Sequence, residues 1–269
     1  MWSKVSLVGI TLAVVIRSVA ADVVYVSSFD NDSILKFDAE SGASLGTFVP
    51  AGSGGLNGPT GLTFGPDGHL YVSSFVFNNN VLKFDGNTGQ FLGVFVASGS
   101  GGLQGPMDLS FGRDGNLYVV SSYAGGVFRY NGLTGASMGQ FTSEPTGAEA
   151  IRWRSRSMYV SSHNSDEVLR FRARNGALLS PITRGFLDWA SFFDDAVMKF
   201  NSRTGQSMGT FAINCFGPEM IEFASNGDLY VASYFGDSID RFDGQTGAWK
   251  KSMFGSGLAG PMDIAFRAR

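Results

Sequence analysis

Four acidic residues have the types and positions that could support metal or acid–base chemistry. Asp108 and Asp263 each follow a Gly-Pro-Met triplet, and Glu149 and Glu219 lie near the same point in two further copies of the pattern. Clustered carboxylates suit a hard cation such as Ca²⁺, which takes roughly six to eight oxygen ligands. They also raise one another's pKa, as acid–base catalysis requires. The sequence therefore predicts a shared site if the copies converge, with Asp108, Asp263 and Glu219 as candidate ligands of Ca²⁺ or another divalent cation.

A purely structural explanation of these four residues stays open. Asp108 and Asp263 stand in nearly identical copies, so each could simply satisfy a local turn or a backbone N–H group. Glu149 and Glu219 sit one position earlier in the pattern, and a shift of one residue along a strand turns a side chain to the opposite face. No catalytic residue is assigned on this basis.

One equivalent position of the pattern is mostly aromatic. Its occupants are Phe29, Phe75, Tyr123, His163, Phe192 and Tyr234. Such a ring could stack on a sugar or a planar ligand, or it could pack between neighbouring repeats, and we favour packing. The candidate ligand-binding residues are Asp108, Asp263, Glu149, Glu219, His163, Phe75, Tyr123 and Tyr234.

The pattern that relates these positions is an internal repeat. An aromatic residue, a polar residue, two variable residues, a Ser, Thr or Asn and then a glycine recur six times, starting at Phe37, Phe84, Tyr130, Phe171, Phe200 and Phe242. Glycine at the last position permits the positive φ that closes a short hairpin. A fixed period of this length indicates a repeat architecture.

The clearest copy predicts four short strands, at residues 61–65, 69–75, 81–85 and 91–96, joined by glycine-containing turns. Four antiparallel strands in about 45 residues are typical of one blade of a β-propeller. Six copies predict an all-β, six-bladed β-propeller over residues 22–269.

Two irregularities refine this prediction. Residues 260–269 match the first strand of a blade, and residues 22–29 match the second strand, so the two ends are expected to complete one blade. The step from Phe171 to Phe200 is only 29 residues. Either blade five lacks its innermost strand, or a segment has been lost from the recorded sequence at this point. Arg152 and Glu222, at positions held by smaller side chains in other blades, are expected to line a solvated notch there or to pair across it.

The copy from Gly58-Pro59-Thr60-Gly61-Leu62 through Asp67-Gly68-His69-Leu70-Tyr71-Val72 to Val81-Leu82-Lys83-Phe84-Asp85 resembles the NHL repeat. It is also similar to the wider group of gluconolactonase-like, strictosidine-synthase-like and TolB-like propellers. The resemblance implies the fold and no particular activity. Gluconolactonase-like propellers bind a metal through a Glu, an Asn and an Asp, and no Glu-Gly-Pro strand start is present here to supply the first.

The composition and the N-terminal residues limit the classes of function that the chain can have. The chain has 37 glycines, 24 phenylalanines, one cysteine (Cys215) and a formal net charge of −3. This charge is a poor match to nucleic acid, whose binding relies on Lys and Arg. Residues 1–21 combine Lys4, an apolar run and small residues, which is typical of a secretory signal peptide. The apolar run is shorter than the roughly 20 residues that span a bilayer.

We therefore expect a secreted, periplasmic or extracellular protein, without a membrane span and monomeric. Its predicted role is a binding or scaffold module for a protein or glycan, acting through the rim loops and the channel mouth. The alternative is a metal-dependent hydrolase or lyase, similar to the lactonases, that uses the acidic residues at the mouth. The prediction of an enzyme rests on resemblance in fold alone, and fold does not establish function, so we favour the binding role over catalysis.

Overall fold

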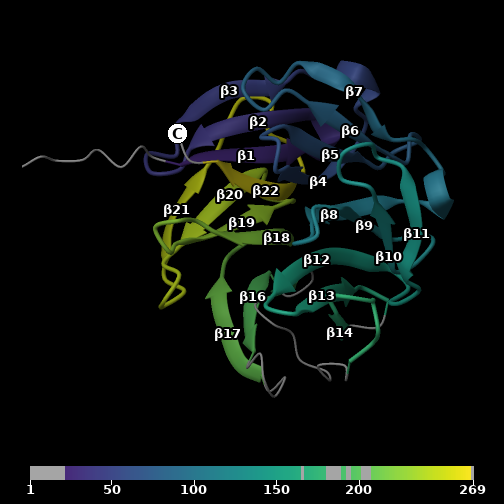
Figure 1. Cartoon of the computed structure of the whole chain (residues 1–269). Coiled ribbons are helices and arrows are strands. Elements are labelled where there is room, and N and C mark those ends of the chain that lie inside the picture. Colours follow the sequence, from purple (N-terminus) through teal and green to yellow (C-terminus); the bar gives the residue numbers. More distant parts are fainter. Residues whose placement is uncertain (1–21, 165–166, 180–188, 192–194, 201–206, 268–269) are drawn as a thin grey trace, which may run out of the picture.

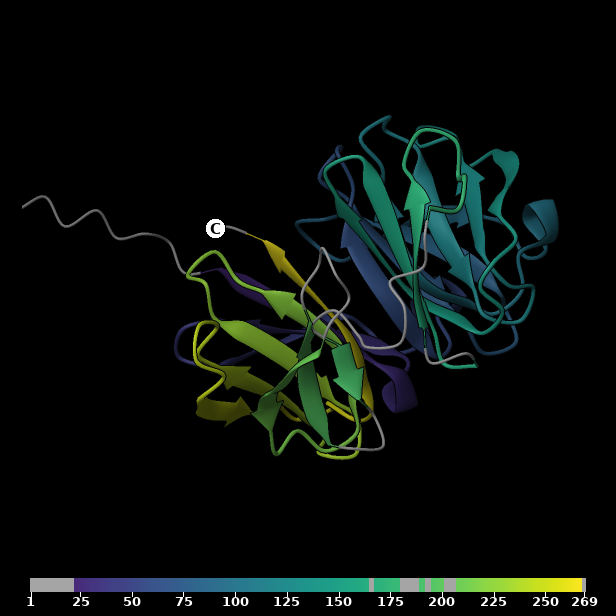
Figure 2. The ribbon, with the colours of Figure 1, turned by 90° about the horizontal axis from the view of Figure 1, so that it is seen from below.

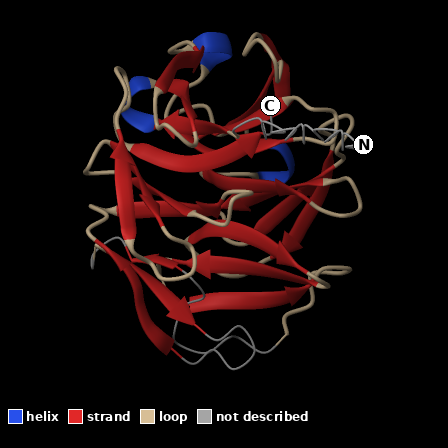
Figure 3. Cartoon of the chain, turned by 90° about the vertical axis from the view of Figure 1, so that its left-hand side faces the viewer, coloured by secondary structure: helices blue, strands red, loops and turns tan. Residues whose placement is uncertain are grey.

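Short antiparallel sheets surround a common centre in the computed structural model, which describes residues 22–164, 167–179, 189–191, 195–200 and 207–267 (Figure 1). The architecture is an all-β propeller, as the repeat predicts. Figure 3 shows that the described chain is built from strands, with helix confined to three short 3₁₀ turns, η1 (Phe29–Asn31), η2 (Ser53–Gly55) and η3 (Ser100–Gly102). No helix in the described part is long and apolar enough to cross a membrane.

The strands form six sheets, four with four strands and two with three. In order of hydrogen-bonded neighbours they are β22 (Pro261–Arg267), β1 (Val23–Ser28), β2 (Ser33–Asp38) and β3 (Ser44–Val49); β4 (Pro59–Phe64), β5 (Leu70–Ser74), β6 (Asn80–Phe84) and β7 (Phe91–Val96); β8 (Pro106–Phe111), β9 (Leu117–Ser121), β10 (Val127–Tyr130) and β11 (Ser137–Thr142); β12 (Ala148–Arg154), β13 (Ser157–Ser162) and β14 (Glu167–Arg172); β15 (Trp189–Ser191), β16 (Ala196–Phe200) and β17 (Ser207–Ile213); and β18 (Pro218–Phe223), β19 (Leu229–Ser233), β20 (Ser238–Phe242) and β21 (Trp249–Met253).

The repeated phrase forms the turn between the third and fourth strands of a sheet. Asp85 accepts hydrogen bonds from the backbone N–H of Thr88 at 2.9 Å and from its hydroxyl at 3.0 Å. Gly89 has φ +74, and a Cβ atom there would lie 1.9 Å from the carbonyl oxygen of Phe48 in the preceding sheet. Glycine is therefore required by the backbone conformation and by the close approach of the neighbouring sheet.

Aromatic side chains fill the space between adjacent sheets. Tyr71 lies edge-to-face between Phe95 of its own sheet and Phe111 of the next, with ring centroids 4.8 and 5.0 Å apart. Tyr25 and Tyr118 repeat the arrangement in their own sheets. Such contacts stabilise beyond the burial of area alone. Because each tyrosine contacts two sheets, the core is a chain of inter-sheet clusters.

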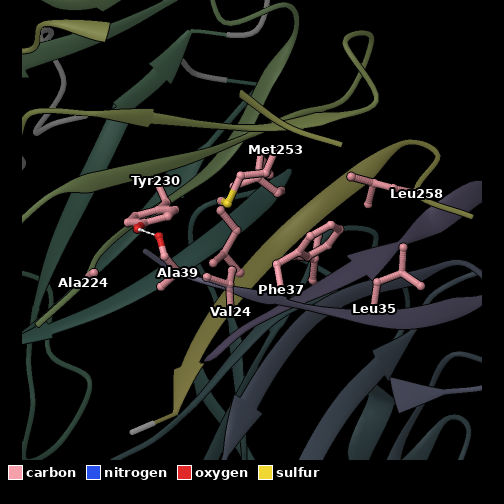
Figure 4. Close-up of a cluster of buried hydrophobic side chains, with 12 residues drawn as sticks. Val24, Leu35, Phe37, Ala39, Ala224, Tyr230, Met253 and Leu258 are labelled. Carbon is pink, nitrogen blue, oxygen red and sulfur yellow. Dashed lines mark hydrogen bonds between the residues drawn. The ribbon is translucent and has the colours of Figure 1, made fainter. Parts of the chain in front are cut away.

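The C-terminal strand completes the N-terminal sheet, as predicted. β22 pairs antiparallel with β1, and Val26 lies opposite Ile264. The cluster beside this sheet joins it to β18–β21, and Tyr230 donates a 2.6 Å hydrogen bond to the carbonyl of Ala39 (Figure 4). The two ends of the described chain are therefore fixed to each other and to the last sheet.

The sequence predicted six blades, whereas the described residues form five blades that have an inner strand. Five strands, β4, β8, β12, β18 and β22, line the centre in the described residues, so five blades rather than six have an inner strand there. The sheet β15–β17 is a partial sixth, and Figure 2 shows its green strands as a group separate from the teal strands of β12–β14. Residues 180–188, which precede β15, and the predicted signal peptide at 1–21 lie outside the described residues.

Removing the closing strand tests its importance. A chain that ends at Gly260 loses β22, so the open edge of β1 and the cluster around Tyr230 become exposed to water. We expect loss of the cooperative thermal transition, measured by circular dichroism. A chain that ends at Arg267 keeps β22 and serves as the control, and equal melting of the two truncated chains would contradict the closure.

Candidate binding site

Each inner strand is irregular near its start, where the predicted acidic positions lie. The pairing register shifts between Pro59 and Leu62, and the same shift recurs in β8, β12 and β18. A bulge of this kind leaves backbone groups without ladder partners and changes the direction of nearby side chains. The backbone N–H groups freed at these points need another acceptor.

Asp263 and Asp108 supply that acceptor across the boundary between adjacent sheets. Asp263 on β22 accepts from the N–H of Leu62 on β4 at 2.9 Å and from that of Ile264 at 2.8 Å. Asp108 on β8 accepts from the N–H of Ile151 on β12, also at 2.9 Å. The structural explanation of these two aspartates is therefore observed, because each accepts from the N–H of the residue that follows it and from an N–H of the next sheet.

The boundary between β4 and β8 uses a different device. Gly61 occupies the position of the two aspartates, and a Cβ atom there would lie 2.6 Å from the carbonyl oxygen of Met107. The hydroxyl of Thr60 instead approaches the carbonyl oxygens of Pro106 and Met107, each at 3.0 Å. Glycine permits close packing at this boundary, and threonine provides the polar contact.

Arg152 connects β12 to β18, where the described residues contain no inner strand between them. Its Nη1 lies 2.6 Å from an Asp108 carboxylate oxygen and donates to the carbonyl of Ile151. Its Nη2 lies 3.5 Å from the carbonyl oxygen of Ile221 and 3.7 Å from Glu222. The Asp108 side chain is 2% exposed and that of Arg152 is 44% exposed. The predicted pairing of Arg152 with Glu222 is confirmed, and the bond to Asp108 is an addition to it.

Arg152 also lines a cavity of about 330 Å³, here called the lower cavity, which lies along the later residues of the inner strands, such as Phe64 and Phe266. This cavity agrees with the predicted notch. Asp108, Asp263, Glu222 and Trp153 line the same space. Burial raises the pKa of Asp108, and the charge of Arg152 and the N–H of Ile151 oppose that shift. Arg152 thus provides the positive charge among these carboxylates.

The opposite end of the channel, at the starts of the inner strands, is the channel mouth. The two glutamates line its cavity, here called the upper cavity. Glu149, Glu219 and Asp263 line a cavity of about 20 Å³ with Thr60 and Met107. This volume suits roughly one water molecule. Asp108 does not line it, so the four predicted carboxylates divide between the upper and lower cavities. A larger ligand would have to dock on the rim above the cavity.

His163 and Glu219 give the mouth its electrostatic character. His163 Nδ1 lies 2.9 Å from Glu149 Oε1. Glu219 has no hydrogen bond or ion pair within the described part of the chain, and burial, together with the nearby charge of Glu149, raises its pKa to about 8. Glu219 is therefore largely protonated at neutral pH, and the mouth carries less negative charge than its composition suggests.

Four of the predicted aromatic residues form an arc at this end of the strands. The ring centroids of Tyr123 and Phe75 are 5.3 Å apart, and Phe29 lies 6.4 Å from both Phe75 and Tyr234. Tyr123 is 68% exposed, and none of the four rings is fully buried. The rings therefore pack between neighbouring sheets, as favoured, but they stay partly exposed and do not form the buried inter-sheet core, which Tyr25, Tyr71 and Tyr118 fill. Phe192 lies outside the described residues.

The aromatic surface extends further than the repeat indicated. Phe235, whose ring centroid is 5.4 Å from that of Tyr234, is 68% exposed, and Phe77 is 89% exposed. Neither occupies the equivalent repeat position, which is why the comparison of repeats missed them. For Phe77, the apolar run Phe75-Val76-Phe77 just before three asparagines was the available signal.

The predicted metal ligands do not form one group. Asp108 lines only the lower cavity and Glu219 only the upper one, whereas Asp263 borders both. Within the described residues no three His, Cys, Asp or Glu side chains are arranged to hold a metal ion. Cys215 is buried, and burial raises its pKa to about 12, so its thiol is a poor nucleophile.

The Arg152 bridge yields a stability prediction. Arg152→Ala leaves the buried Asp108 carboxylate without its cation, so we expect a loss of roughly 2–4 kcal/mol, above the value for exposed pairs. The loss should be partly relieved in the double variant with Asp108→Asn, measured by urea unfolding. Arg154→Ala, an exposed neighbour on the same strand, is the control. A loss for Arg152→Ala below about 0.5 kcal/mol would refute the bridge.

Glu219 yields a pH prediction. Its folded pKa of about 8 lies above the ordinary value of roughly 4.3, so its contribution to stability is full at low pH and is lost as pH rises through 8. Glu219→Gln should match the native chain at pH 5 and be roughly 1–3 kcal/mol more stable at pH 9, measured by urea unfolding. The exposed Glu40→Gln should show no such difference. Equal effects of Glu219→Gln at both pH values would contradict the assignment.

Comparison with known proteins supports the fold. No family model and no curated protein sequence matches the chain. Among solved structures, a chain from the crystal structure of a nidogen/laminin complex aligns over 91% of this chain and 98% of its own length, at 10% identity and a TM-score of 0.70. A protein of unknown function from Bacteroides caccae aligns over 92% of this chain and 99% of its own length, at 14% identity and a TM-score of 0.68. At these identities the chain is similar to both in fold.

Proposed function

We propose that this chain is a protein-binding β-propeller module whose partner docks on the aromatic arc of Phe29, Phe75, Tyr123 and Tyr234 and on the channel mouth beneath it. The observation that carries the proposal is the arc itself. Its rings contact one another and remain partly open to solvent, although the inter-sheet core is filled without them. Solvent-exposed aromatic side chains in a contiguous patch commonly mark interaction sites.

The chemistry of the mouth fits a binding role. Tyrosine and phenylalanine provide large contact areas at low cost in side-chain entropy, and they are frequent among residues that dominate binding energies. His163 and Glu149 place a polar pair beside the rings, 2.9 Å apart, which can contribute orientation. One solved neighbour in fold comes from a complex of nidogen with laminin, and this is an analogy from fold alone.

The hydrolase alternative receives less support from the geometry. The carboxylates of Asp108 and Asp263 each accept backbone hydrogen bonds from the neighbouring inner strand, so they are committed to holding strands together. The binding proposal takes the chain as an exported monomer with an NHL-like, six-bladed ring in which β15–β17 is the incomplete blade. A glycan is the other class of partner predicted from the sequence. It would bind at the same mouth and would then compete with a bound peptide.

Selection from a displayed peptide library against the purified protein tests this function. We expect enriched peptides to bind in solution, and Tyr123→Ser to weaken them by about tenfold or more, as for an exposed residue that dominates an interface. Trp249→Ser, which removes a 57% exposed aromatic at the start of β21, should leave binding unchanged. If no peptide is enriched, or if both variants bind as the native chain does, the proposal fails.

A further inference from the structure

The sheet β12–β14 departs from the other sheets in the charge of its turns. Arg156 lies in the turn between β12 and β13, and Arg172 and Arg174 follow at the end of β14. With Arg113 of the preceding sheet they line one pocket, here called the basic pocket. The formal net charge of the chain is −3, so this concentration of arginine is a local feature.

The residue at the position of Arg172 has a structural role in other sheets. It is an Asp or Asn whose side chain accepts hydrogen bonds from the N–H and hydroxyl groups of the residue three places later. These residues are Asp38, Asp85, Asn131 and Asp243. Such side-chain caps stabilise turns.

Arg172 cannot accept these hydrogen bonds. Its turn is closed by backbone bonds, from the N–H of Gly176 to the carbonyl of Arg172 at 3.0 Å and from the N–H of Arg172 to the carbonyl of Ala177 at 2.8 Å. The residue three places later is Asn175, where the other turns have Ser or Thr. Arginine therefore gives this turn no side-chain cap, and its side chain lines the basic pocket instead.

The turn between β12 and β13 shows the same exchange. In the preceding sheets, Asp67 and Asp114 in this turn accept hydrogen bonds from Tyr71 and Tyr118, each at 2.9 Å. The shorter turn of β12–β13 has Ser155 and Arg156 instead. In two separate turns of one sheet, arginine thus stands where other sheets have an Asp or Asn that accepts hydrogen bonds, and both arginines line the basic pocket.

The basic pocket has a volume of about 840 Å³, within the usual range of roughly 300–1,000 Å³ for small-molecule sites. Tyr118, Trp153 and Leu179 add aromatic and apolar lining. None of its four arginines forms an ion pair with an acidic residue in the part of the chain that the structure describes. Asp114 is the acidic residue of the lining, and its carboxylate accepts from Tyr118 and Asn116.

We propose that the basic pocket binds a short anionic oligosaccharide that bears sulfate or phosphate groups. Guanidinium groups match the geometry of tetrahedral oxyanions through paired hydrogen bonds. Four of them on three turns fit a ligand with several anionic groups better than a single ion. The exposed part of Trp153 offers an apolar face on which a sugar ring can pack.

The surroundings disfavour two other polyanions. A nucleic acid depends on an extended positive field, and the net acidic chain provides only a local one. An anionic membrane is a flat surface, whereas these arginines line a concave pocket. The site is also separate from the channel mouth, because β9 runs from the Arg113 turn at one end toward Tyr123 at the other. The inference therefore goes beyond the proposed protein-binding function and does not depend on it.

A heparin-derived tetrasaccharide serves as the probe, with binding measured by isothermal titration calorimetry on the full chain. The decisive variant combines Arg172→Asp with Asn175→Thr, which restores the cap found in the other sheets. We expect this variant to melt at the same or a higher temperature than the native chain and to bind the probe about tenfold or more weakly. Arg156→Gln, on a different turn, should also weaken binding, and Lys251→Gln on β21 should not.

Several results would overturn the proposal. One is the absence of binding at about 1 mM tetrasaccharide, which corresponds to a negligible affinity. Another is equal binding by the native chain, the cap-restoring variant and Arg156→Gln. Equal affinity for a desulfated tetrasaccharide, for inorganic sulfate, for vesicles of anionic lipid or for a short single-stranded oligonucleotide would remove the assignment to a sulfated or phosphorylated glycan.

Discussion

The hydrogen bonds from buried aspartates to the backbone of the next inner strand are the constraint on which this propeller depends. Adjacent sheets of a propeller do not share a ladder, so the N–H groups freed by the bulges would be buried without partners. An unsatisfied buried donor costs roughly 1–3 kcal/mol. Asp263 and Asp108 supply these acceptors at two boundaries. At a third boundary the Thr60 hydroxyl instead donates to the carbonyl oxygens of Pro106 and Met107, beside the close approach that Gly61 permits.

Arg152 makes a comparable side-chain link between β12 and β18, where the described residues contain no inner strand in between. Its guanidinium binds Asp108, which already holds β8 to β12, and reaches the Ile221 carbonyl and Glu222 on β18. A single side chain on β12 therefore contacts both β8 and β18 beside the lower cavity. The positions of Thr63, Ser110 and Ala265 in other sheets need only small side chains because neighbouring strands there lie in direct contact.

The repeat made the fold predictable, because strand order, turn positions and the pairing of the chain ends follow from its phase. It also identified Arg152 and Glu222 by their departure from the pattern. Three features could not be read from it. The division of the carboxylates between two cavities depends on bulges, which change side-chain direction without changing spacing. The exposure of the aromatic arc depends on which aromatic residue in or after each second strand fills the core, and Tyr71 rather than Phe75 does so in β5. The basic pocket requires Arg113 and Arg172, 59 positions apart, to be neighbours.

The two ends of the propeller thus carry different chemistry, with aromatic rings and a protonated glutamate at one and arginine-bearing turns at the other. Both depend on inner strands that the aspartate bonds hold in place. Native-state amide hydrogen exchange at Leu62 and Ile151 tests that dependence most directly. The account predicts exchange as slow as that of buried amides in β5 and β9, because opening these bonds separates adjacent sheets. Exchange as fast as that of exposed turn amides would contradict it.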